Sequence, residues 1–294
     1  MQGKIIRGVG GFYYVNTDDD GIFECRARGI FRKLGKKPLV GDDVIFEITS
    51  LTDREGSITE LLPRKNELFR PAAANVDQAL VVFALHSPEP SLMLLDRFLI
   101  AMDRQNVPSA ILFNKADLEE AGEQAELLNT YQHSGHKLFF SCVEEGKGLR
   151  ELAAFFDRKT TLLAGPSGVG KSSLINASQS KVRMETGEIS RKLLRGKNTT
   201  RHAELISCGG GTYLMDTPGF TLLETRGIEK EELRRYYAEF ASWEGKCRFD
   251  SCVHIDEPGC RVKEAVEAGR ISRTRYANYR GIFRELKEQE KHRY

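Results

Sequence analysis

Short runs of β-branched and aromatic residues, separated by turns that contain Gly, fill the first 70 positions of the chain. Such runs are typical of strands, and the Asp-rich turns at 18–21 and 41–43 would separate three of them. The predicted strands are Ile5–Val9, Gly11–Val15, Ile22–Arg28, Val44–Ile48 and Ser57–Leu61. Five short strands in this length favour an OB-fold barrel, with an SH3-like barrel as the alternative.

Residues 71–228 have a different pattern, in which continuous apolar runs alternate with stretches of helical spacing. Continuous apolar runs are typical of parallel strands buried on both faces. The predicted strands are Leu80–Leu85, Ala110–Phe113, Leu138–Phe140, Thr161–Ala164, Glu204–Ser207 and Tyr213–Met215. Helical spacing relates Leu92, Leu95, Phe98, Leu99 and Met102, which indicates a helix packed on the core. We therefore expect a doubly wound α/β domain with ligand loops at the carboxyl ends of its strands.

The last region, residues 229–294, is predicted to end in a long helix from about 272 to 291. Five apolar or aromatic side chains share one face of it: Tyr276, Tyr279, Ile282, Phe283 and Leu286. Together the three patterns divide the chain at 1–70, 71–228 and 229–294. A multidomain α/β protein with a barrel at its N-terminus and a small α-helical domain at its C-terminus is expected.

Composition limits the partners. The chain has 294 residues, of which 40% are hydrophobic and 29% charged, as in folded globular proteins. It shows no apolar run of membrane-spanning length and no signal peptide, so a cytoplasmic protein without a membrane partner is expected. The formal net charge is only +2, so any affinity for nucleic acid must come from local patches.

One such patch lies between residues 26 and 37, which hold six basic residues and no acidic one: Arg26, Arg28, Arg32, Lys33, Lys36 and Lys37. A solvated loop would explain it. Beside a barrel, contact with the phosphates of a single strand is the favoured interpretation. The C-terminal helix is also rich in Lys and Arg, which fits RNA contact as well as a solvated outer face.

The run from Gly165 to Ser172 fits the phosphate-loop pattern G-x-x-x-x-G-K-[ST] and lies between a predicted strand and a helix-like stretch. Its glycines would let backbone N–H groups surround phosphate oxygens, and the helix N-terminus adds positive potential. Lys171 would reach the β- and γ-phosphates, and the Ser172 hydroxyl would bind Mg²⁺. The predicted phosphate-binding residues are Gly165, Pro166, Ser167, Gly168, Val169, Gly170, Lys171, Ser172 and Ser173.

Two further loops are predicted to recognise the base. Asn114, Lys115 and Asp117 fit the N-K-x-D pattern of guanine-specific GTPases directly after a predicted strand. The Asp117 carboxylate could accept both N1–H and the 2-amino group of guanine, a donor pair that adenine lacks. Ser141 and Cys142 follow the next strand and resemble the S-A-x loop that closes over guanine O6. GTP and GDP are therefore the expected nucleotides, and an ATPase or kinase is disfavoured.

Two segments resemble the switches that respond to the γ-phosphate. Asp216 begins a D-x-x-G motif, in which it would hold the Mg²⁺ shell through water and the Gly219 N–H would sense the γ-phosphate. Thr199 and Thr200 lie where the first switch is expected. Because Mg²⁺ is a hard cation that prefers oxygen ligands, one of their hydroxyls would complete its coordination, and Thr200 is favoured.

The order of these motifs differs from that of ordinary GTPases. The base-reading loops at 114 and 141 precede the phosphate loop at 165 and the switches at 199 and 216. We interpret this as a circular permutation, which is physically reasonable because the ends of such domains lie at the surface, often close together. The second switch then leads straight into the C-terminal region, which could receive the nucleotide state.

The C-terminal region contains Cys247, Cys252, His254 and Cys260 in the spacing C-x4-C-x-H-x5-C. Three thiolates and an imidazole form a closed tetrahedral set that suits structural Zn²⁺ and leaves no position for catalytic water. The alternative is four unrelated loop residues, which the polar surroundings of the stretch make unattractive. The other cysteines, including Cys25 and Cys208, are expected to be packing residues.

The motifs N-K-A-D, G-P-S-G-V-G-K-S-S, D-T-P-G-F and C-x4-C-x-H-x5-C together resemble the RsgA (YjeQ/YloQ) family of ribosome small-subunit-dependent GTPases, over essentially the whole chain. The resemblance implies a late assembly factor that binds the 30S subunit and 16S rRNA, with weak GTP hydrolysis stimulated by the subunit. DNA is not an expected partner, and a monomer is expected. Family members often carry His before the two switch threonines, whereas this chain has Asn198.

The group that orients the attacking water is not evident. Many GTPases place Gln after D-x-x-G, but this chain has Phe220, which cannot form a hydrogen bond. Candidates for charge stabilisation near the first switch are Arg191, Arg195 and Arg201. Asn198, the nearby His202 or a ribosomal group could replace the missing His. Slow intrinsic turnover is therefore expected, raised by a partner that orders the switch. The alternative from another class is a non-catalytic RNA-binding scaffold that uses GTP only to hold its shape.

Overall fold

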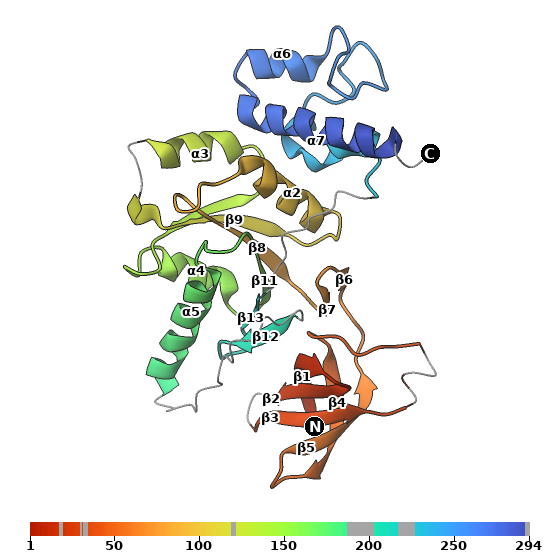
Figure 1. The fold of residues 1–294 in the computed structure, drawn as a ribbon, viewed down its shortest axis with the longest axis vertical. Coiled ribbons are helices and arrows are strands. Elements are labelled where there is room, and N and C mark those ends of the chain that lie inside the picture. The colour runs from red at the N-terminus through yellow and green to blue at the C-terminus, as the bar shows by residue number, and fades with distance from the viewer. Residues whose placement is uncertain are drawn as a thin grey trace.

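The computed structural model describes residues 1–17, 20–29, 31, 35–118, 122–186, 203–216 and 227–291, with the backbone alone at 180–186. Three units follow one another along the long axis of the molecule (Figure 1). A β-barrel lies at one end, a sheet covered by helices in the middle, and a small helical unit at the other end. The multidomain α/β architecture predicted from the sequence is confirmed.

The N-terminal unit is a closed five-stranded barrel in the order β1-β2-β3-β5-β4. Its strands are β1 (Gln2–Val9), β2 (Phe12–Thr17), β3 (Gly21–Ala27), β4 (Asp43–Ser50) and β5 (Glu55–Leu61). All five predicted strands are present, and the barrel is OB-like, as expected. Alternate side chains such as Val15, Phe23 and Phe46 point inward and form its core.

The basic stretch from 26 to 37 is partly described. Arg26, Arg28, Lys36 and Lys37 are exposed, whereas Phe31, which lies among them in sequence, is buried in the barrel core. Arg32 and Lys33 lie outside the described residues. The stretch therefore combines an apolar anchor with cations that face solvent.

The middle unit is a six-stranded sheet in the order β10-β9-β8-β11-β13-β12. Its strands are β8 (Gln78–Ala84), β9 (Ser109–Asn114), β10 (Lys137–Ser141), β11 (Thr160–Ala164), β12 (Glu204–Ser207) and β13 (Tyr213–Asp216). All six match the predicted strands. The pairs among β10, β9, β8, β11 and β13 are parallel, and β12 adds an antiparallel edge.

Helices cover the sheet: α2 (Leu92–Asp103), α3 (Glu123–Tyr131), α4 (Leu149–Phe156) and α5 (Lys171–Thr186). A short hairpin, β6 (Glu67–Phe69) with β7 (Ala72–Ala74), precedes β8, and a 3₁₀ turn covers Ala116–Leu118. Every residue of β8 and of β11 is buried, as expected for parallel strands with helices on both faces.

The C-terminal unit consists of two short 3₁₀ helices followed by α6 (Arg261–Glu267) and α7 (Arg273–Lys291). The 3₁₀ helices cover Lys230–Tyr236 and Ala238–Phe240. The sequence suggested a region poor in core residues, but Tyr237, Phe240 and Tyr279 form a buried aromatic cluster with ring centroids 5.0–5.3 Å apart. These aromatic residues come from short turns and from α7, so no single periodicity reveals them.

The described part of the chain offers no helix with both the length and the apolar character that a membrane crossing requires.

Candidate nucleotide and metal sites

The predicted nucleotide motifs meet at one edge of the middle sheet, where its parallel strands end. Asn114 is the last residue of β9 and pairs in register with Ser141, the last residue of β10. Asp216 is the last residue of β13 and pairs with Leu163 of β11, one position before the strand ends and the phosphate loop begins. Carboxyl ends of parallel strands form the usual ligand crevice of such sheets. The fold therefore gathers motifs that are well separated in the sequence, from Asn114 to Asp216.

Asn114 links the two loops that are predicted to read the base to the predicted phosphate loop. Its amide is buried, with 3% of the residue exposed. Nδ2 donates to the Val169 carbonyl at 3.0 Å, and Oδ1 accepts from the Ser141 hydroxyl at 3.0 Å and from the Val143 N–H at 3.4 Å. One side chain thus holds three loops in register. A buried amide satisfied on both ends is costly to replace, because its partners would lose their hydrogen bonds.

Glycine is required at two positions of the phosphate loop, because neighbouring atoms leave no room there for a side chain. Gly165 has φ 140°, and a Cβ there would lie 2.1 Å from the Val82 carbonyl oxygen. Gly170 has φ 95°, and a Cβ there would lie 2.2 Å from Nδ2 of Asn114. Side chains at either position would push the loop away from β8 or from the base-reading Asn. The glycines therefore set the loop geometry that a phosphate cradle needs.

Lys171 lies at the start of α5 and folds over the loop. Its Nζ donates to the carbonyls of Gly165 at 2.7 Å and Pro166 at 2.6 Å. Burial lowers the pKa of Lys171, and the neighbouring Asp216 opposes that shift. The ammonium is thus held within the loop, next to the β13 carboxylate, at the position where a phosphate chain would replace the carbonyls as its partner.

Ser172 and Ser173 occupy the first turn of α5 and are exposed, whereas the following Leu174 and Ile175 are buried against the sheet. The hydroxyls therefore face outward at a helix N-terminus, where the helix dipole favours anions. This arrangement fits a nucleotide phosphate and a hydroxyl-bound Mg²⁺.

Asp117 follows Asn114 through a 3₁₀ turn and is exposed. A hydrogen bond from the Cys142 thiol is the main cause that lowers its pKa. Burial is the main cause that raises the pKa of the Cys142 thiol, which keeps that group protonated and able to donate. The carboxylate is therefore ionised and oriented from the neighbouring loop. An exposed carboxylate of this kind can accept the two donors of a guanine.

Lys115 adopts a left-handed backbone with φ 61°, and its Nζ donates to the Ser87 carbonyl. That carbonyl belongs to the loop between β8 and α2, which the motif analysis did not include. Val143, whose N–H reaches Asn114, belongs to the segment that resembles the S-A-x loop, but this contact was not predicted. Neither contact has a sequence pattern, because both are made by backbone atoms.

Several predicted residues cannot be placed. The switch residues Thr199, Thr200 and Gly219 lie outside the described residues, as do Asn198, His202, Phe220, Arg191, Arg195 and Arg201. Of the switch motifs, Asp216 alone belongs to the described part of the chain.

The C-terminal unit brings together all four predicted zinc ligands. His254 Nδ1 lies 3.7 Å from Sγ of Cys247 and 3.4 Å from Sγ of both Cys252 and Cys260. The sulfurs of Cys247 and Cys260 are 4.0 Å apart. Tetrahedral Zn²⁺, with bonds of about 2.3 Å to sulfur and about 2.0 Å to nitrogen, would set its ligands about 3.5–3.8 Å apart. The four side chains therefore fit this ion.

The surroundings of the cluster hold its ligands in place. Burial is the main cause that lowers the pKa of His254, which favours the neutral imidazole that a metal requires. Tyr276 donates to the His254 carbonyl at 2.7 Å, and Glu257 accepts from the N–H groups of Val253 and Ile255 at 2.8 and 2.9 Å. These hydrogen bonds fix the backbone of the ligand loop around His254 against α7, as in a closed structural site.

Comparison with known proteins gives a consistent result. The family model described as RsgA GTPase matches residues 61–226, and the model described as RsgA N-terminal domain matches residues 2–58. The crystal structure of YjeQ from Thermotoga maritima is 36% identical and superposes with a TM-score of 0.79, covering 97% of this chain and 98% of its own. The crystal structure of YloQ, described as a circularly permuted GTPase, is 37% identical and superposes with a TM-score of 0.77. The match covers 98% of this chain and 95% of YloQ.

Two full-length relatives carry the name small ribosomal subunit biogenesis GTPase RsgA. The protein from Agathobacter rectalis is 48% identical over 99% of this chain and 100% of its own length. The protein from Caldanaerobacter subterraneus is 49% identical over 100% of this chain and 98% of its own length. Fold and site thus define a circularly permuted GTPase with an OB-like barrel and a zinc cluster. The chain belongs to the RsgA GTPase family. It is therefore a GTP-hydrolysing enzyme that uses GTP, GDP and Mg²⁺, and its Cys₃His cluster is consistent with Zn²⁺.

Proposed function

We propose that the protein binds the 30S ribosomal subunit and 16S rRNA late in small-subunit maturation, and that the subunit stimulates its GTP hydrolysis. The names of the relatives support a role in small-subunit biogenesis. The observation that carries the enzymatic part is the Asn114 bridge, which joins base-reading and phosphate-binding loops into one site. We further propose a cytoplasmic monomer divided near residues 70 and 228.

In this proposal the described loops bind GTP in two halves. Asp117 accepts the N1–H and 2-amino donors of guanine, while Ser141 and Cys142 line the O6 side and Lys115 covers the ring. The phosphate chain lies in the loop Gly165–Ser173, where backbone N–H groups and Lys171 surround the β- and γ-phosphates. The contacts of Lys171 with loop carbonyls support this, because they place its ammonium over the cradle.

Hydrolysis transfers the γ-phosphoryl group of GTP to water and yields GDP and phosphate. Mg²⁺, when bound, neutralises charge on the phosphate oxygens, and we assign its protein oxygens to Ser172 and Thr200, with Asp216 acting through water. Lys171 stabilises charge that develops as the bond to the β–γ bridging oxygen breaks. Gly219 senses the γ-phosphate through its N–H.

The D-x-x-G motif is followed by Phe220 rather than by a Gln that could orient the attacking water. Slow intrinsic turnover follows from this, and a ribosomal group or an ordered first switch would supply the missing orientation. The bound subunit would therefore act as the activator.

The barrel carries stacked cations and aromatic rings that suit RNA. The guanidinium of the exposed Arg26 lies 4.7 Å from the Phe12 ring centroid. Bases stack on aromatic and guanidinium planes, while the charges attract phosphates. The Arg26–Phe12 pair supports rRNA contact by the barrel.

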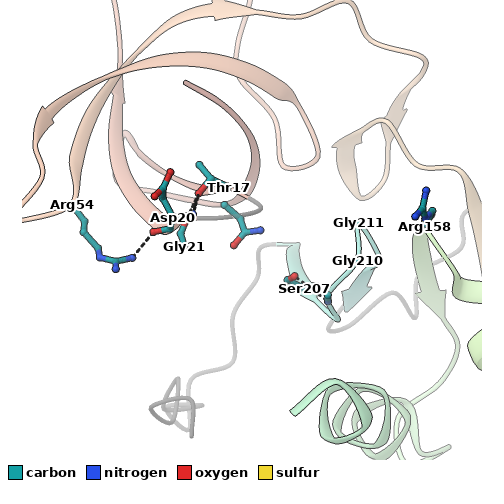
Figure 2. Close-up of a pocket in the computed structure, with 10 residues that line it drawn as sticks. Thr17, Asp20, Gly21, Arg54, Arg158, Ser207, Gly210 and Gly211 are labelled. Carbon is teal, nitrogen blue, oxygen red and sulfur yellow. Dashed lines mark hydrogen bonds between the residues drawn. The ribbon is translucent and has the colours of Figure 1, made fainter. Parts of the chain in front are cut away.

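A cleft of about 1000 Å³ lies between the barrel and the β12–β13 turn (Figure 2). Arg54 from the barrel and Arg158 from the middle unit both line it, and Arg54 donates to the Asp20 carbonyl at 2.8 Å. The turn itself consists of glycines 209–211, each with positive φ. Two arginines around a polar cleft would favour backbone phosphates of an RNA strand.

Binding is tested by pelleting the protein with purified 30S subunits in the presence of GDP or a non-hydrolysable GTP analogue. The proposal predicts strong co-sedimentation with the analogue and weaker co-sedimentation with GDP. Arg54→Ser with Arg158→Ser should weaken it and lessen its dependence on salt, because phosphate contacts are lost. Equal recovery with 50S subunits would contradict the proposed partner.

A further inference from the structure

A buried arginine joins the C-terminal unit to the middle unit. Arg275 of α7 is 2% exposed, and its Nη1 donates to Oδ1 of Asp96 in α2 at 2.5 Å. Its Nε and Nη2 donate to the two oxygens of Glu239 at 2.8 and 3.2 Å. Asp96 is itself completely buried. One guanidinium thus pairs with carboxylates from two units that are far apart in sequence.

Asp96 gathers further contacts around the same point. Its Oδ1 also accepts from the Tyr131 hydroxyl of α3 at 2.9 Å, and its Oδ2 accepts from Nδ2 of Asn278 in α7 at 2.8 Å. The Arg275 guanidinium lies 4.4 Å from the Tyr237 ring centroid and 5.2 Å from that of Tyr131. Buried charges persist only when they are paired and hydrogen-bonded in this way. We refer to Asp96, Arg275, Glu239, Tyr131 and Asn278 as the clamp.

The packing around the clamp is close. A Cβ on Gly281 of α7 would lie 2.6 Å from Cε of Met93 in α2, so the glycine lets the two helices approach. Ile100 of α2 belongs to the apolar core of the C-terminal unit, and Arg97 forms an ion pair with Glu285. Figure 1 shows α2 and α7 side by side. The contact is therefore an extension of a hydrophobic core rather than a polar surface contact.

The N-terminal end of α2 also connects to the nucleotide site. The loop before this helix contains Ser87, whose carbonyl accepts the Lys115 ammonium. The next residue, Pro88, faces the phosphate loop: a Cβ on Gly168 would lie 3.9 Å from its Cδ. The segment that supports Lys115 and borders the phosphate loop thus continues directly into the helix that holds the zinc-binding unit.

We infer that the clamp fixes the zinc-binding unit to α2 and α3, so that this unit and the base-reading side of the GTPase domain move as one rigid body. The chain connection through the second switch suggested that nucleotide state could reach the C-terminus directly. With the clamp in place, a displacement of the zinc-binding unit must carry α2 with it. The position of the zinc-binding unit is then coupled to the position of the base-reading loops. This coupling does not depend on which ribosomal partner binds.

Hydrogen exchange of the full-length, zinc-loaded protein tests this inference. Arg275→Met leaves two buried carboxylates without their cation, so peptides of α7, α2 and α3 should all exchange at least about tenfold faster, because removing one partner of a buried pair is strongly destabilising. Barrel peptides should be unchanged. Arg273→Met, at an exposed position of the same helix, serves as the matched control and should match the wild type. Hydrogen exchange at the wild-type rate in the Arg275→Met variant would overturn the inference.

The rigid-body claim has its own test. With GDP and then a non-hydrolysable GTP analogue, wild-type α2 and α7 peptides should change together or not at all. A nucleotide-dependent change in α7 without one in α2 would overturn the claim. If Arg275→Met does not fold, Asn278→Ala removes a single hydrogen bond from an uncharged amide to Asp96. This variant should raise exchange in α2 and α7 together by a smaller factor. A rise in α7 alone would again contradict the clamp.

Discussion

The nucleotide site and the zinc-binding unit are built in opposite ways. The nucleotide site relies on backbone shape: glycines that admit close approach, one buried amide at Asn114, and an Asp117 carboxylate left at the surface. The zinc-binding unit encloses its ligands in an aromatic core and joins the neighbouring domain through a buried ion pair. A site that must exchange its ligand keeps its polar groups accessible, whereas a structural site buries them. Substitutions should therefore affect catalysis in the first region and folding in the second.

The largest effect is expected from Cys252→Ser. Loss of one thiolate opens the tetrahedral set, and structural zinc contributes roughly 10–16 kcal/mol of apparent binding free energy to folding. The variant should lose bound zinc and show an unfolded C-terminal unit, measured by metal analysis and by hydrogen exchange of α6 and α7. Cys208→Ser, at a buried cysteine outside the cluster, should retain full zinc. A stable, zinc-free C-terminal unit would contradict the structural role.

Lys171→Ala should act on turnover and leave the fold intact. Removing one charged donor to a developing charge costs about 10²–10³ in rate. GTP hydrolysis should therefore fall by at least that factor, with a thermal midpoint close to that of the wild type. The measurement is multiple-turnover phosphate release, with zinc content as the control for the distant unit. Full activity in this variant would disprove the proposed phosphate site.

Asp117→Asn should change which base is bound. The amide can no longer accept two donors from guanine, so GTP affinity should fall by about 10²-fold. Xanthine offers an acceptor where guanine has its 2-amino group, so xanthosine triphosphate should bind better than GTP. Fluorescent-nucleotide titration of wild type and variant decides this. An unchanged preference for guanine would place base recognition elsewhere.

The smallest effect is expected at the edge of the nucleotide site. Hydrogen bonds to Glu89 and then Glu123 raise the pKa of His86 above its ordinary value of 6.5. A raised folded-state pKa stabilises the fold below the unfolded value, and this contribution disappears as pH rises through the folded pKa. Thermal midpoints of wild type and His86→Asn should thus differ slightly at pH 6 and converge at alkaline pH. A difference that grows with pH would contradict this sign.

The sequence predicted the strands and the local motifs well, because each depends on neighbouring residues. Continuous apolar runs located β8 and β11, and the spacing of four ligands located the zinc cluster. The clamp escaped prediction because Asp96 and Arg275 lie 179 positions apart and neither belongs to a motif. The Asp96 carboxylate also interrupts an apolar helix face, where a buried charge is not expected without its partner. Backbone contacts such as that of Ser87 leave no pattern at all.

The most direct test of the central claim is GTP hydrolysis by the purified protein alone, with 30S subunits and with 50S subunits. The account predicts a slow rate alone, clear stimulation by 30S subunits, and no stimulation by 50S subunits. Lys171→Ala should remain inactive under all three conditions. An equally low rate in all three, or equal stimulation by both subunits, would contradict a small-subunit-dependent GTPase.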